Sequence, residues 1–597
     1  MTRRVALALL ALAVLAPAAH AATGTGTTRT LPGQFTPKRG PAQLTEKRVT
    51  AIFLRDDKVA DWLDRYRKKD LVSDATFDKD RRDWEIGVWA TSAGEIATGR
   101  VDDETGEVTE AWTGPQVAWK MARGTTGAFG GKQINSVPIW LGLCVLFFIG
   151  LADFRKPLTM RNLDLLVLLS FSASLWFFNR GDIFTAVPLA YPPLAYLLAR
   201  MVWSAWRGGP ERGRPVWPVW LLASATVFLV GFRIGLNVRG ANVIDVGYSG
   251  VIGANRIVNG QSPYGHMPKE GTLKPCGNAD AEGEIRERIQ TNDRCKSANE
   301  RGDTYGPVAY ESYVPGYLVF GWSGRWDKLP AAHATAVLFD LLALLGLALL
   351  GRRFGGTRLA ATLPFAWASY PFTQYVSSSN TNDAIMPVFL IFGFWLATSA
   401  FARGAFLALA GWTKFGALLL APLWAGYPEA KLPARVRART SRGSRLLLFA
   451  GGFAVATAAA FSILLLEPSP AHAARVFWDR TFGWQIGRDS PFSIWGWGQY
   501  HAAGIPDFGP FQQIAIALLV AGAIACYFVP RRKTPLQLAA LTAAVLIGFE
   551  LTLTHWFYLY IPWFFPFVAF VVLAARRRRV ETVPPHDDAE RELVPAG

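Results

Sequence analysis

Blocks of apolar residues, each about as long as a membrane is thick, recur along most of this 597-residue chain. A helix needs roughly 20 apolar residues to cross about 30 Å of hydrocarbon. Few charges interrupt the blocks, so the chain is predicted to be a polytopic α-helical membrane protein. The eleven predicted spans are 136–151, 163–179, 184–203, 217–237, 333–350, 359–375, 384–402, 446–466, 511–529, 536–553 and 556–574.

The formal net charge of +17 is compatible with nucleic-acid binding when it is considered alone. Arginine and lysine, however, lie beside alternate spans, which is the distribution expected of cytoplasmic segments. The lipid bilayer is therefore the expected environment, and no nucleic-acid partner is inferred. The same rule places 238–332 and 467–510 outside a cell membrane and the C-terminus in the cytoplasm.

The N-terminus has the layout of a secretory signal peptide. Two arginines precede a short apolar run, and Ala19-His20-Ala21 provides a small-residue cleavage site. An uncleaved anchor is the alternative. The predicted units are 1–21 signal peptide, 22–40 flexible leader, 41–125 exported domain, 136–203 three additional spans, 217–575 membrane core and 576–597 disordered tail.

The exported unit is predicted to be a small α+β domain. Residues 56–70 have helical spacing, and three short strands are expected at 84–91, 95–102 and 107–112. A closing helix is expected from 114 to 123. This pattern resembles PepSY-type domains, which are small modules of exported proteins.

The segment 405–425 is apolar but has basic residues at both ends. Both ends are therefore expected in the cytoplasm, although about 20 residues are too few for two crossings. A re-entrant helical hairpin with Trp412-Thr413-Lys414 at its tip satisfies both constraints. Such a break at membrane depth is tolerated only inside protein or beside a water-filled cavity.

Polar residues without an anchoring role converge on the predicted outer face. The apolar stretch 307–322 lies between outer segments, so we expect it to lie flat in the interface as an amphipathic helix. Asp245 is expected just outside the fourth span, where small residues such as Gly247 and Gly250 leave room for a ligand. The other candidates are Tyr264, Asp303, Tyr305, Asn380, Asp383, Arg480, Trp484, Arg488, Trp495 and His555.

The order of these motifs resembles that of the GT-C class of membrane glycosyltransferases. An early Asp245 is followed by a Tyr-x-Pro helix at Tyr313, an external Asn-x-Asn-Asp at 380–383 and the Thr-Lys-Phe at 413–415. Within the class, the chain is most similar to glycosyltransferase family 87, whose members use polyprenol-phosphate-mannose. The resemblance covers roughly 217–575.

The resemblance implies transfer of a hexose, usually mannose, from a polyprenyl-phosphate-sugar donor with inversion. The acceptor is a glycan, lipid or protein outside the membrane, and no cofactor is required. Asp245 is the expected general base. Lys414, Arg480, Arg488 and His555 are expected to contact the donor phosphate, and Tyr264, Asp303, Tyr305, Asn380, Asp383, Trp484 and Trp495 to bind substrate.

Structural alternatives stay open at this point. Asn380 and Asp383 are also good helix-capping material, and the tryptophans suit an interfacial belt. Asp303 and Glu311 could form a second acidic site or take part in a salt bridge. The first outer loop lacks a DxD motif, so metal dependence is not supported.

Two cysteines, Cys276 and Cys295, lie in the first outer loop, and we expect them to form a disulfide because that compartment permits one. Cys144 and Cys526 lie inside spans and are expected to be small core residues.

Two other classes of function compete with an enzyme. A transporter or flippase of lipid-linked intermediates would show internal repeats and polar groups near mid-membrane, and no clear repeat is found. A non-catalytic assembly factor of the cell envelope is the third reading.

Overall fold

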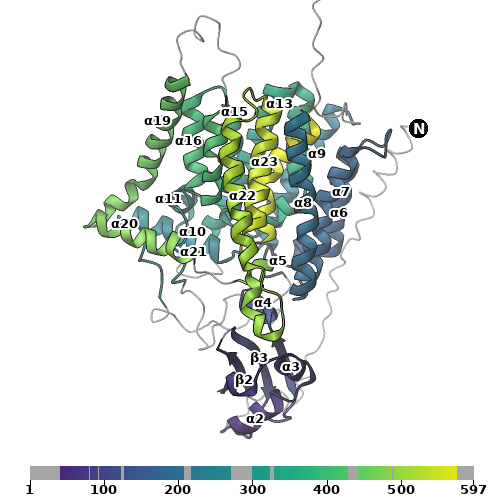
Figure 1. Ribbon diagram of the computed structural model, residues 1–597, viewed down its shortest axis with the longest axis vertical. Coiled ribbons are helices and arrows are strands. Elements are labelled where there is room, and N and C mark those ends of the chain that lie inside the picture. The colour runs from purple at the N-terminus through teal and green to yellow at the C-terminus, as the bar shows by residue number, and fades with distance from the viewer. Residues whose placement is uncertain are drawn as a thin grey trace, which may run out of the picture.

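The computed structural model describes residues 41–79, 81–91, 93–122, 127–207, 217–269, 299–322, 329–427, 442–486 and 490–574. Helices that run roughly side by side form a bundle, and a small domain with a β-sheet protrudes from one end of it (Figure 1). We call this end the domain end. The protein is thus a polytopic α-helical protein with a small α+β domain, as the sequence predicts.

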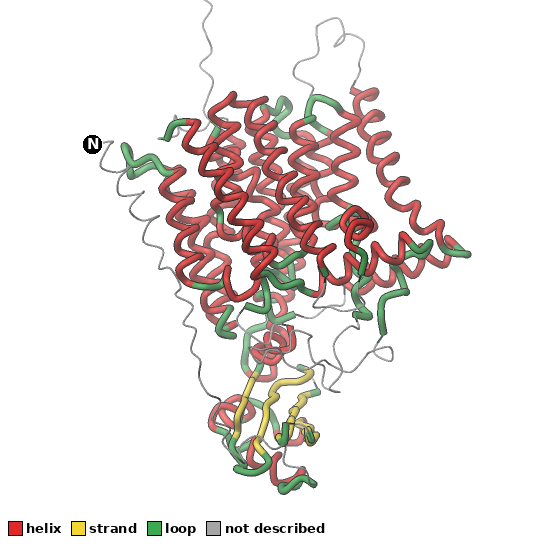
Figure 2. The backbone as a smooth tube through the Cα atoms, turned by 180° about the vertical axis from the view of Figure 1, so that it is seen from behind, coloured by secondary structure: helices red, strands yellow, loops and turns green. Residues whose placement is uncertain are grey.

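The strands of the small domain lie together in one sheet (Figure 2). The sheet is antiparallel, with the strand order β1-β2-β3-β4. The side chains of Val49, Phe53, Ile86 and Ile96 are fully buried in its core. The elements are α2 (Glu46–Phe53), α3 (Asp57–Leu63), η1 (Lys68–Asp70), β1 (Leu71–Asp78), β2 (Asp83–Ala90), β3 (Gly94–Asp102), β4 (Val108–Thr113) and α4 (Pro115–Ala122).

The sequence patterns missed α2 and β1 and made α3 too long. β1 is a sheet edge, and its side chains at 72–74 and 76 are exposed. Its sequence therefore lacks the apolar alternation by which the other strands were found. What defines it as a strand is its pairing with β2, from Leu71 opposite Ala90 to Asp78 opposite Asp83.

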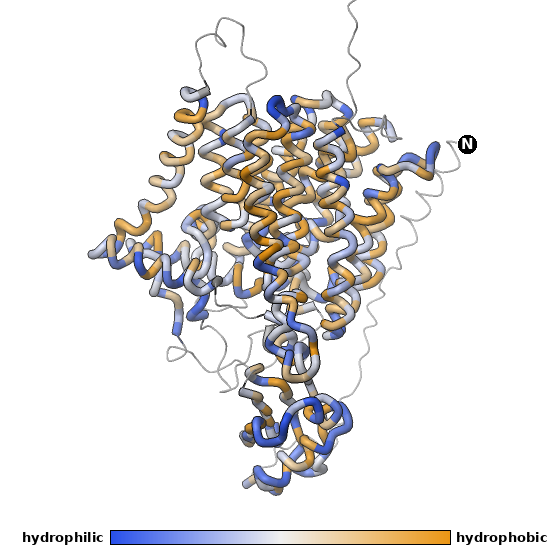
Figure 3. The backbone as a smooth tube through the Cα atoms, viewed as in Figure 1, coloured by the Kyte–Doolittle hydropathy of each residue, from blue (hydrophilic) through white to orange (hydrophobic). Residues whose placement is uncertain are grey.

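Each predicted span overlaps a helix of the bundle, although the seventh span ends earlier than predicted. Apolar residues run along these helices, whereas hydrophilic residues gather in the domain and at helix ends (Figure 3). Within the described ranges, six helices are long and apolar enough to cross a membrane, by length and composition. The bundle helices are α6 (Val137–Leu151), α7 (Met160–Phe178), α8 (Ile183–Arg207), α9 (Val219–Gly240), α13 (Pro330–Ser369), α15 (Ile385–Trp395), α19 (Arg442–Phe461), α22 (Gly509–Phe528), α23 (Pro535–Thr552) and α24 (Ile561–Leu573).

The 40-residue α13 supplies two of the predicted spans because it bends sharply at Gly356, where φ is 76°. Glycine adopts this left-handed conformation without steric cost. A Cβ added at Gly351 would lie 2.5 Å from the Leu359 carbonyl oxygen, so the two arms approach closely beside the bend. The second arm leads into α14 (Pro371–Ser378).

Short helices lie across the domain end. The stretch 307–322 forms α11 (Pro307–Glu311) and α12 (Val314–Phe320), and neither is long enough to cross a bilayer. Two short helices thus replace the single interfacial helix expected, and their lengths agree with the prediction that the stretch does not cross. The others are α10 (Asp245–Val258), α20 (Pro470–Trp478), η6 (Asp479–Gly483), α21 (Trp484–Ile486) and η7 (Ile494–Ala503).

The chain between α15 and α19 doubles back on itself as the predicted hairpin. It comprises α16 (Ala400–Gly411), a turn at 412–414, η4 (Phe415–Leu420) and α17 (Ala421–Ala425). Its two ends meet, because the buried guanidinium of Arg403 donates to the carbonyl oxygens of Ala397, Trp424 (3.0 Å) and Tyr427 (3.2 Å). Its tip reaches the domain end, where Trp412 backbone atoms pack against Gly306.

The hairpin begins earlier than predicted. We expected the seventh span to run to 402 and Arg403 to lie in a cytoplasmic loop. Instead α15 ends at Trp395, and Arg403 is fully buried in α16. Carbonyl groups at helix ends have no partner within the helix, and Arg403 binds three of them, so its charge does not mark a loop.

The domain is packed against the bundle through aromatic rings. Trp62 lies 6.1 Å from Phe184 of α8 and 6.1 Å from Tyr500 of η7, centroid to centroid. Tyr500 is 3% exposed and belongs to the hydrophobic core of the domain. The segment that carries η7 is thus held by both parts of the molecule.

Candidate active site

Lys414 stands at the hairpin tip, in extended backbone between α16 and η4. Its side chain is buried, and its Nζ lies 3.0 Å from Asp383 Oδ1 and 4.4 Å from the centroid of the Tyr305 ring. A lysine at membrane depth is costly unless it is paired or functional. Here the carboxylate and the ring face compensate the charge.

Asp383 belongs to η3 (Asn382–Ala384), directly before α15. Its other oxygen, Oδ2, accepts a 2.5 Å hydrogen bond from the Thr381 hydroxyl. Neither η3 nor α15 has a side-chain cap, so the capping alternative is wrong.

Asn380, unlike Asp383, forms hydrogen bonds that connect two helices. Its φ is 51°, a conformation that asparagine tolerates better than most residues. Its amide accepts a hydrogen bond from Asn237 Nδ2 (2.8 Å) and donates one to the Asn242 carbonyl (3.1 Å). Asn380 therefore ties the end of α14 to the end of α9, and it is fully buried.

Aromatic rings complete the surroundings of Lys414, and a buried carboxyl group lies within electrostatic reach of its partner Asp383. The rings of Tyr560 and Trp563 lie 5.9 and 5.7 Å from Nζ. Glu550, near the end of α23, is 2% exposed and accepts a 3.0 Å hydrogen bond from Trp556 Nε1. Sequence reasoning missed Glu550, although a carboxylate inside an apolar span is a recognisable signal of function.

A second cluster centres on Asp303, whose side chain is fully buried. Its Oδ2 accepts a hydrogen bond from the Gly265 N–H (2.8 Å) and lies 3.2 Å from Arg480 Nε. Burial raises the pKa of Asp303, while the Gly265 N–H and the Arg480 charge oppose that rise. Arg480 remains partly exposed, at 24% of its side chain.

Tyr305 connects the two clusters. Its ring covers Lys414, and its carbonyl oxygen accepts a 2.9 Å hydrogen bond from the Tyr264 hydroxyl. Tyr264 is itself packed edge-on against Phe477, with centroids 5.0 Å apart, and burial raises its pKa. Tyr264 therefore supports the loop that holds Tyr305.

Glu311 lies in α11 and is partly buried. Burial raises its pKa from 4.5 to about 7. Asp303 forms an ion pair with Arg480, so the salt-bridge alternative holds for Asp303.

Asp245 is the first residue of α10 and is exposed. Its backbone oxygen accepts hydrogen bonds from Ser249 Oγ (2.7 Å) and Asn299 Nδ2 (3.2 Å). The preceding Ile244 N–H donates to the Ser379 carbonyl at 3.3 Å. The start of α10 therefore rests on the segment that leads to Asp383.

The small residues of α10 serve packing, which corrects the expectation that they leave room for a ligand. A Cβ at Gly247 would lie 2.1 Å from the Asn380 carbonyl oxygen, and one at Gly250 would lie 2.4 Å from the Tyr313 ring. Larger residues would push α10 away from its neighbours.

The remaining candidates occupy other surroundings. His555 Nδ1 lies 2.8 Å from Ser490 Oγ, Trp495 Nε1 donates to the Leu551 carbonyl (2.7 Å), and the Arg301 guanidinium stacks on Trp484 at 4.2 Å. Their substrate-binding roles stay predictions. Arg488, Cys276 and Cys295 lie outside the described residues.

No group of three or more His, Cys, Asp or Glu side chains with the geometry to hold a metal occurs in the described part of the chain.

Comparison with known proteins assigns no family: no family model matches the chain, and neither does any curated protein. Among solved structures, it is similar to the crystal structure of ArnT from Cupriavidus metallidurans bound to undecaprenyl phosphate. The identity is 16% and the TM-score 0.38, over 60% of this chain. The match spans 59% of the length of that protein.

Proposed function

We propose that the protein is a GT-C-type glycosyltransferase. It moves a hexose, in the first place mannose, from a polyprenyl-phosphate-sugar donor to an acceptor on the domain side of the membrane, with inversion. The observation that supports this most is Lys414, which the re-entrant hairpin carries to the domain end and buries beside Asp383 and Tyr305.

The depth of Lys414 suits a lipid-linked phosphate. A polyprenyl tail stays in the hydrocarbon, so its phosphate stays near the boundary where the hairpin tip lies. In this structure the Asp383 carboxylate contacts the Lys414 ammonium group at 3.0 Å, which is the contact that we propose for an oxygen of the donor phosphate. Binding of the donor phosphate thus exchanges one anion for another at the same ammonium group.

Glycosyl transfer from a lipid phosphate requires a base for the acceptor hydroxyl and fixed cations for the departing phosphate. The acceptor hydroxyl gives its proton to the Asp245 carboxylate and attacks the anomeric carbon from the face opposite the phosphate. The bond between that carbon and the phosphate oxygen breaks, and polyprenyl phosphate leaves with an additional negative charge. Lys414 and Arg480 stabilise that charge, and preorganised cations of this kind supply a large share of catalysis.

The test uses the purified full-length chain in detergent with a panel of polyprenyl-phosphate hexoses and pentoses. Release of free polyprenyl phosphate is measured with and without an acceptor extract. We expect release with at least one hexose donor, and much less with Lys414→Met. Movement of intact donor across a vesicle membrane without cleavage would contradict the proposal and favour the flippase alternative.

A further inference from the structure

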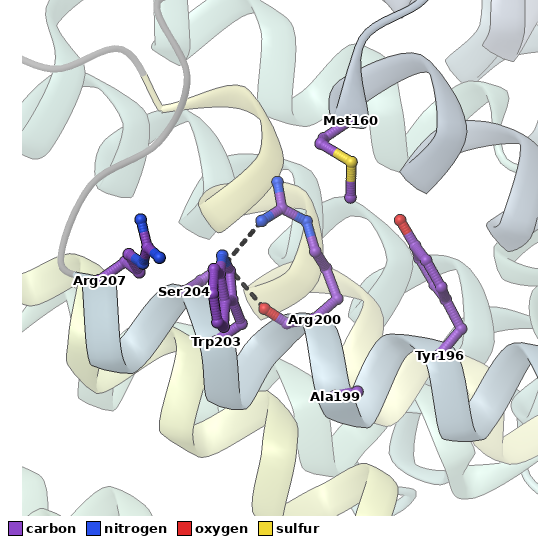
Figure 4. A pocket seen from close by; sticks show the side chains of 7 residues that line it. All are labelled: Met160, Tyr196, Ala199, Arg200, Trp203, Ser204 and Arg207. Atoms are coloured by element: carbon purple, nitrogen blue, oxygen red, sulfur yellow. Dashed lines mark hydrogen bonds between the residues drawn. The ribbon is translucent and has the colours of Figure 1, made fainter.

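A pocket of about 560 Å³ lies far from the candidate active site, along the last turns of α8 (Figure 4). Its lining residues recur at helical spacing on one face of α8, and Met160, the first residue of α7, faces them. This is the end of the bundle opposite the domain (Figure 1). The lining residues are Met160, Tyr196, Ala199, Arg200, Trp203, Ser204 and Arg207.

A buried polar triad forms the inner wall. Asp164 of α7 is fully buried, and both its oxygens lie 3.1 Å from Arg200 Nε. The Tyr196 hydroxyl donates to the same carboxylate at 2.8 Å. Asp164 thus holds Arg200 in place and neutralises it, while Arg200 Nη1 turns to the Ser204 hydroxyl (3.4 Å).

The outer wall is apolar except for one cation. Arg207 is exposed and stacks on the Trp203 ring at 4.4 Å. Trp203 is 52% exposed and Trp206 81%, as expected of tryptophans at a membrane boundary. Among the described residues Arg207 has no acidic partner, so its charge is not neutralised by the side chains that line the pocket.

We propose that this pocket is a binding site for an anionic phospholipid. The lipid phosphate contacts Arg207 and the outer edge of the Arg200 guanidinium, and an acyl chain lies along Trp203, Ala199 and Met160. Basic pockets between spans recognise anionic lipids through charge. A free phosphate ion would leave the apolar wall without a contact, whereas the acyl chain of a lipid would cover it. We therefore infer that the occupant is a lipid. The site is independent of the glycosyltransferase proposal.

The experiment measures lipid retention by native mass spectrometry of the purified full-length chain in detergent. Dioleoyl-phosphatidylglycerol and dioleoyl-phosphatidylcholine differ in headgroup charge but not in chains. We expect preferential retention of phosphatidylglycerol. Arg207→Gln should weaken this retention about fivefold, because a basic residue near a membrane surface contributes about 1 kcal/mol.

Matched variants separate the site from surface charge in general. Arg180 also stacks on an exposed tryptophan, Trp176 at 3.5 Å, but at the other end of α7. Arg180→Gln should retain the lipid as the unmodified chain does, and Arg207→Lys should retain most of it. Equal retention of the two lipids, equal losses in Arg180→Gln and Arg207→Gln, or displacement of phosphatidylglycerol by millimolar inorganic phosphate would each overturn the proposal.

Discussion

At the scale of single residues, the acidic groups of the candidate site differ in how firmly they are held. Asp303 and Asp383 are buried, and each has a basic partner, Arg480 and Lys414 respectively. The Asp245 side chain is exposed, and it has no ion-pair partner in the described part of the chain. A general base has to reach a substrate hydroxyl, and Asp245 is the acid free to do so.

Replacing Asp245 with asparagine keeps the size of the side chain and removes its ability to accept a proton. Transfer should fall by about 100- to 10,000-fold, the usual contribution of a general base. Donor binding and thermal stability should not change. Near-normal turnover by a folded Asp245→Asn protein would exclude Asp245 as the base.

Lys414→Met keeps the apolar stem and removes the charge. If Lys414 binds the donor phosphate, donor affinity and turnover should both fall. The variant also leaves Asp383 buried without its cation, so Lys414→Met combined with Asp383→Asn is the matched control for folding. Donor affinity unchanged in the double variant would rule out the phosphate role.

Glu311 predicts a pH dependence of stability. Its pKa is about 7 in the folded chain and 4.5 ordinarily, so the folded state binds more protons between these values. Stability should therefore fall as the pH rises from about 4.5 to about 7. Glu311→Gln should melt higher than the unmodified chain at pH 8 and equally at pH 4. The same pH profile in both proteins would show that Glu311 is solvated.

At the scale of elements, buried polar contacts specify how the helices pair. Arg233 of α9 lies 2.8 Å from Asp340 of α13, and Trp367 Nε1 donates to the same carboxylate at 2.7 Å. Van der Waals packing alone discriminates poorly between faces of apolar helices in lipid, whereas an unpaired charge there is costly. This pair therefore selects one arrangement of the two helices.

Asp340→Ala should destabilise the protein by about 3–5 kcal/mol, the usual cost of removing one partner of a buried ion pair. The double variant Arg233→Met with Asp340→Ala removes both charges and should recover much of this loss. Thermal unfolding of the unmodified chain, Arg233→Met, Asp340→Ala and the double variant, all in one detergent, gives the coupling free energy between the two side chains. If the stability losses of the two single variants add up to the loss in the double variant, the interaction between Arg233 and Asp340 contributes nothing to stability.

At the scale of the whole molecule, the domain and the candidate site lie at the same end of the bundle. The domain contacts η7 through Trp62 and Tyr500, and η7 follows directly on the segment with Ser490 and Phe492 that packs against His555. The domain therefore contacts the same stretch of chain, 490–503, that packs against His555.

The sidedness of the bundle can be tested with single cysteines in a background whose native cysteines are serine. Gln261, exposed at the domain end, should react with a membrane-impermeant reagent from outside intact cells. Ser399 and Gly443 flank the hairpin, are exposed at the opposite end and should react only in inside-out vesicles. Labelling of Ser399 and Gly443 from different sides would show that 400–427 crosses the membrane.

The spans and the hairpin were predictable from the sequence because both follow from local quantities. Hydrocarbon thickness sets how many apolar residues a crossing needs, and the basic residues on both sides of 405–425 indicate that its ends lie together. The aromatic and acidic residues between the spans also marked the end of the bundle where a site was to be expected.

Only the tertiary structure decided which of these residues meet. Lys414 pairs with Asp383, and Asp303 pairs with Arg480, although the partners are far apart in the sequence. The residues next to each of them in the sequence give no sign of which partner it will meet. Arg403 looked like a loop charge and proved to bind carbonyl groups inside the hairpin, and β1 became a strand through its partner. The length of an apolar run is a property of each segment, whereas a buried polar contact depends on the packing of several segments at once.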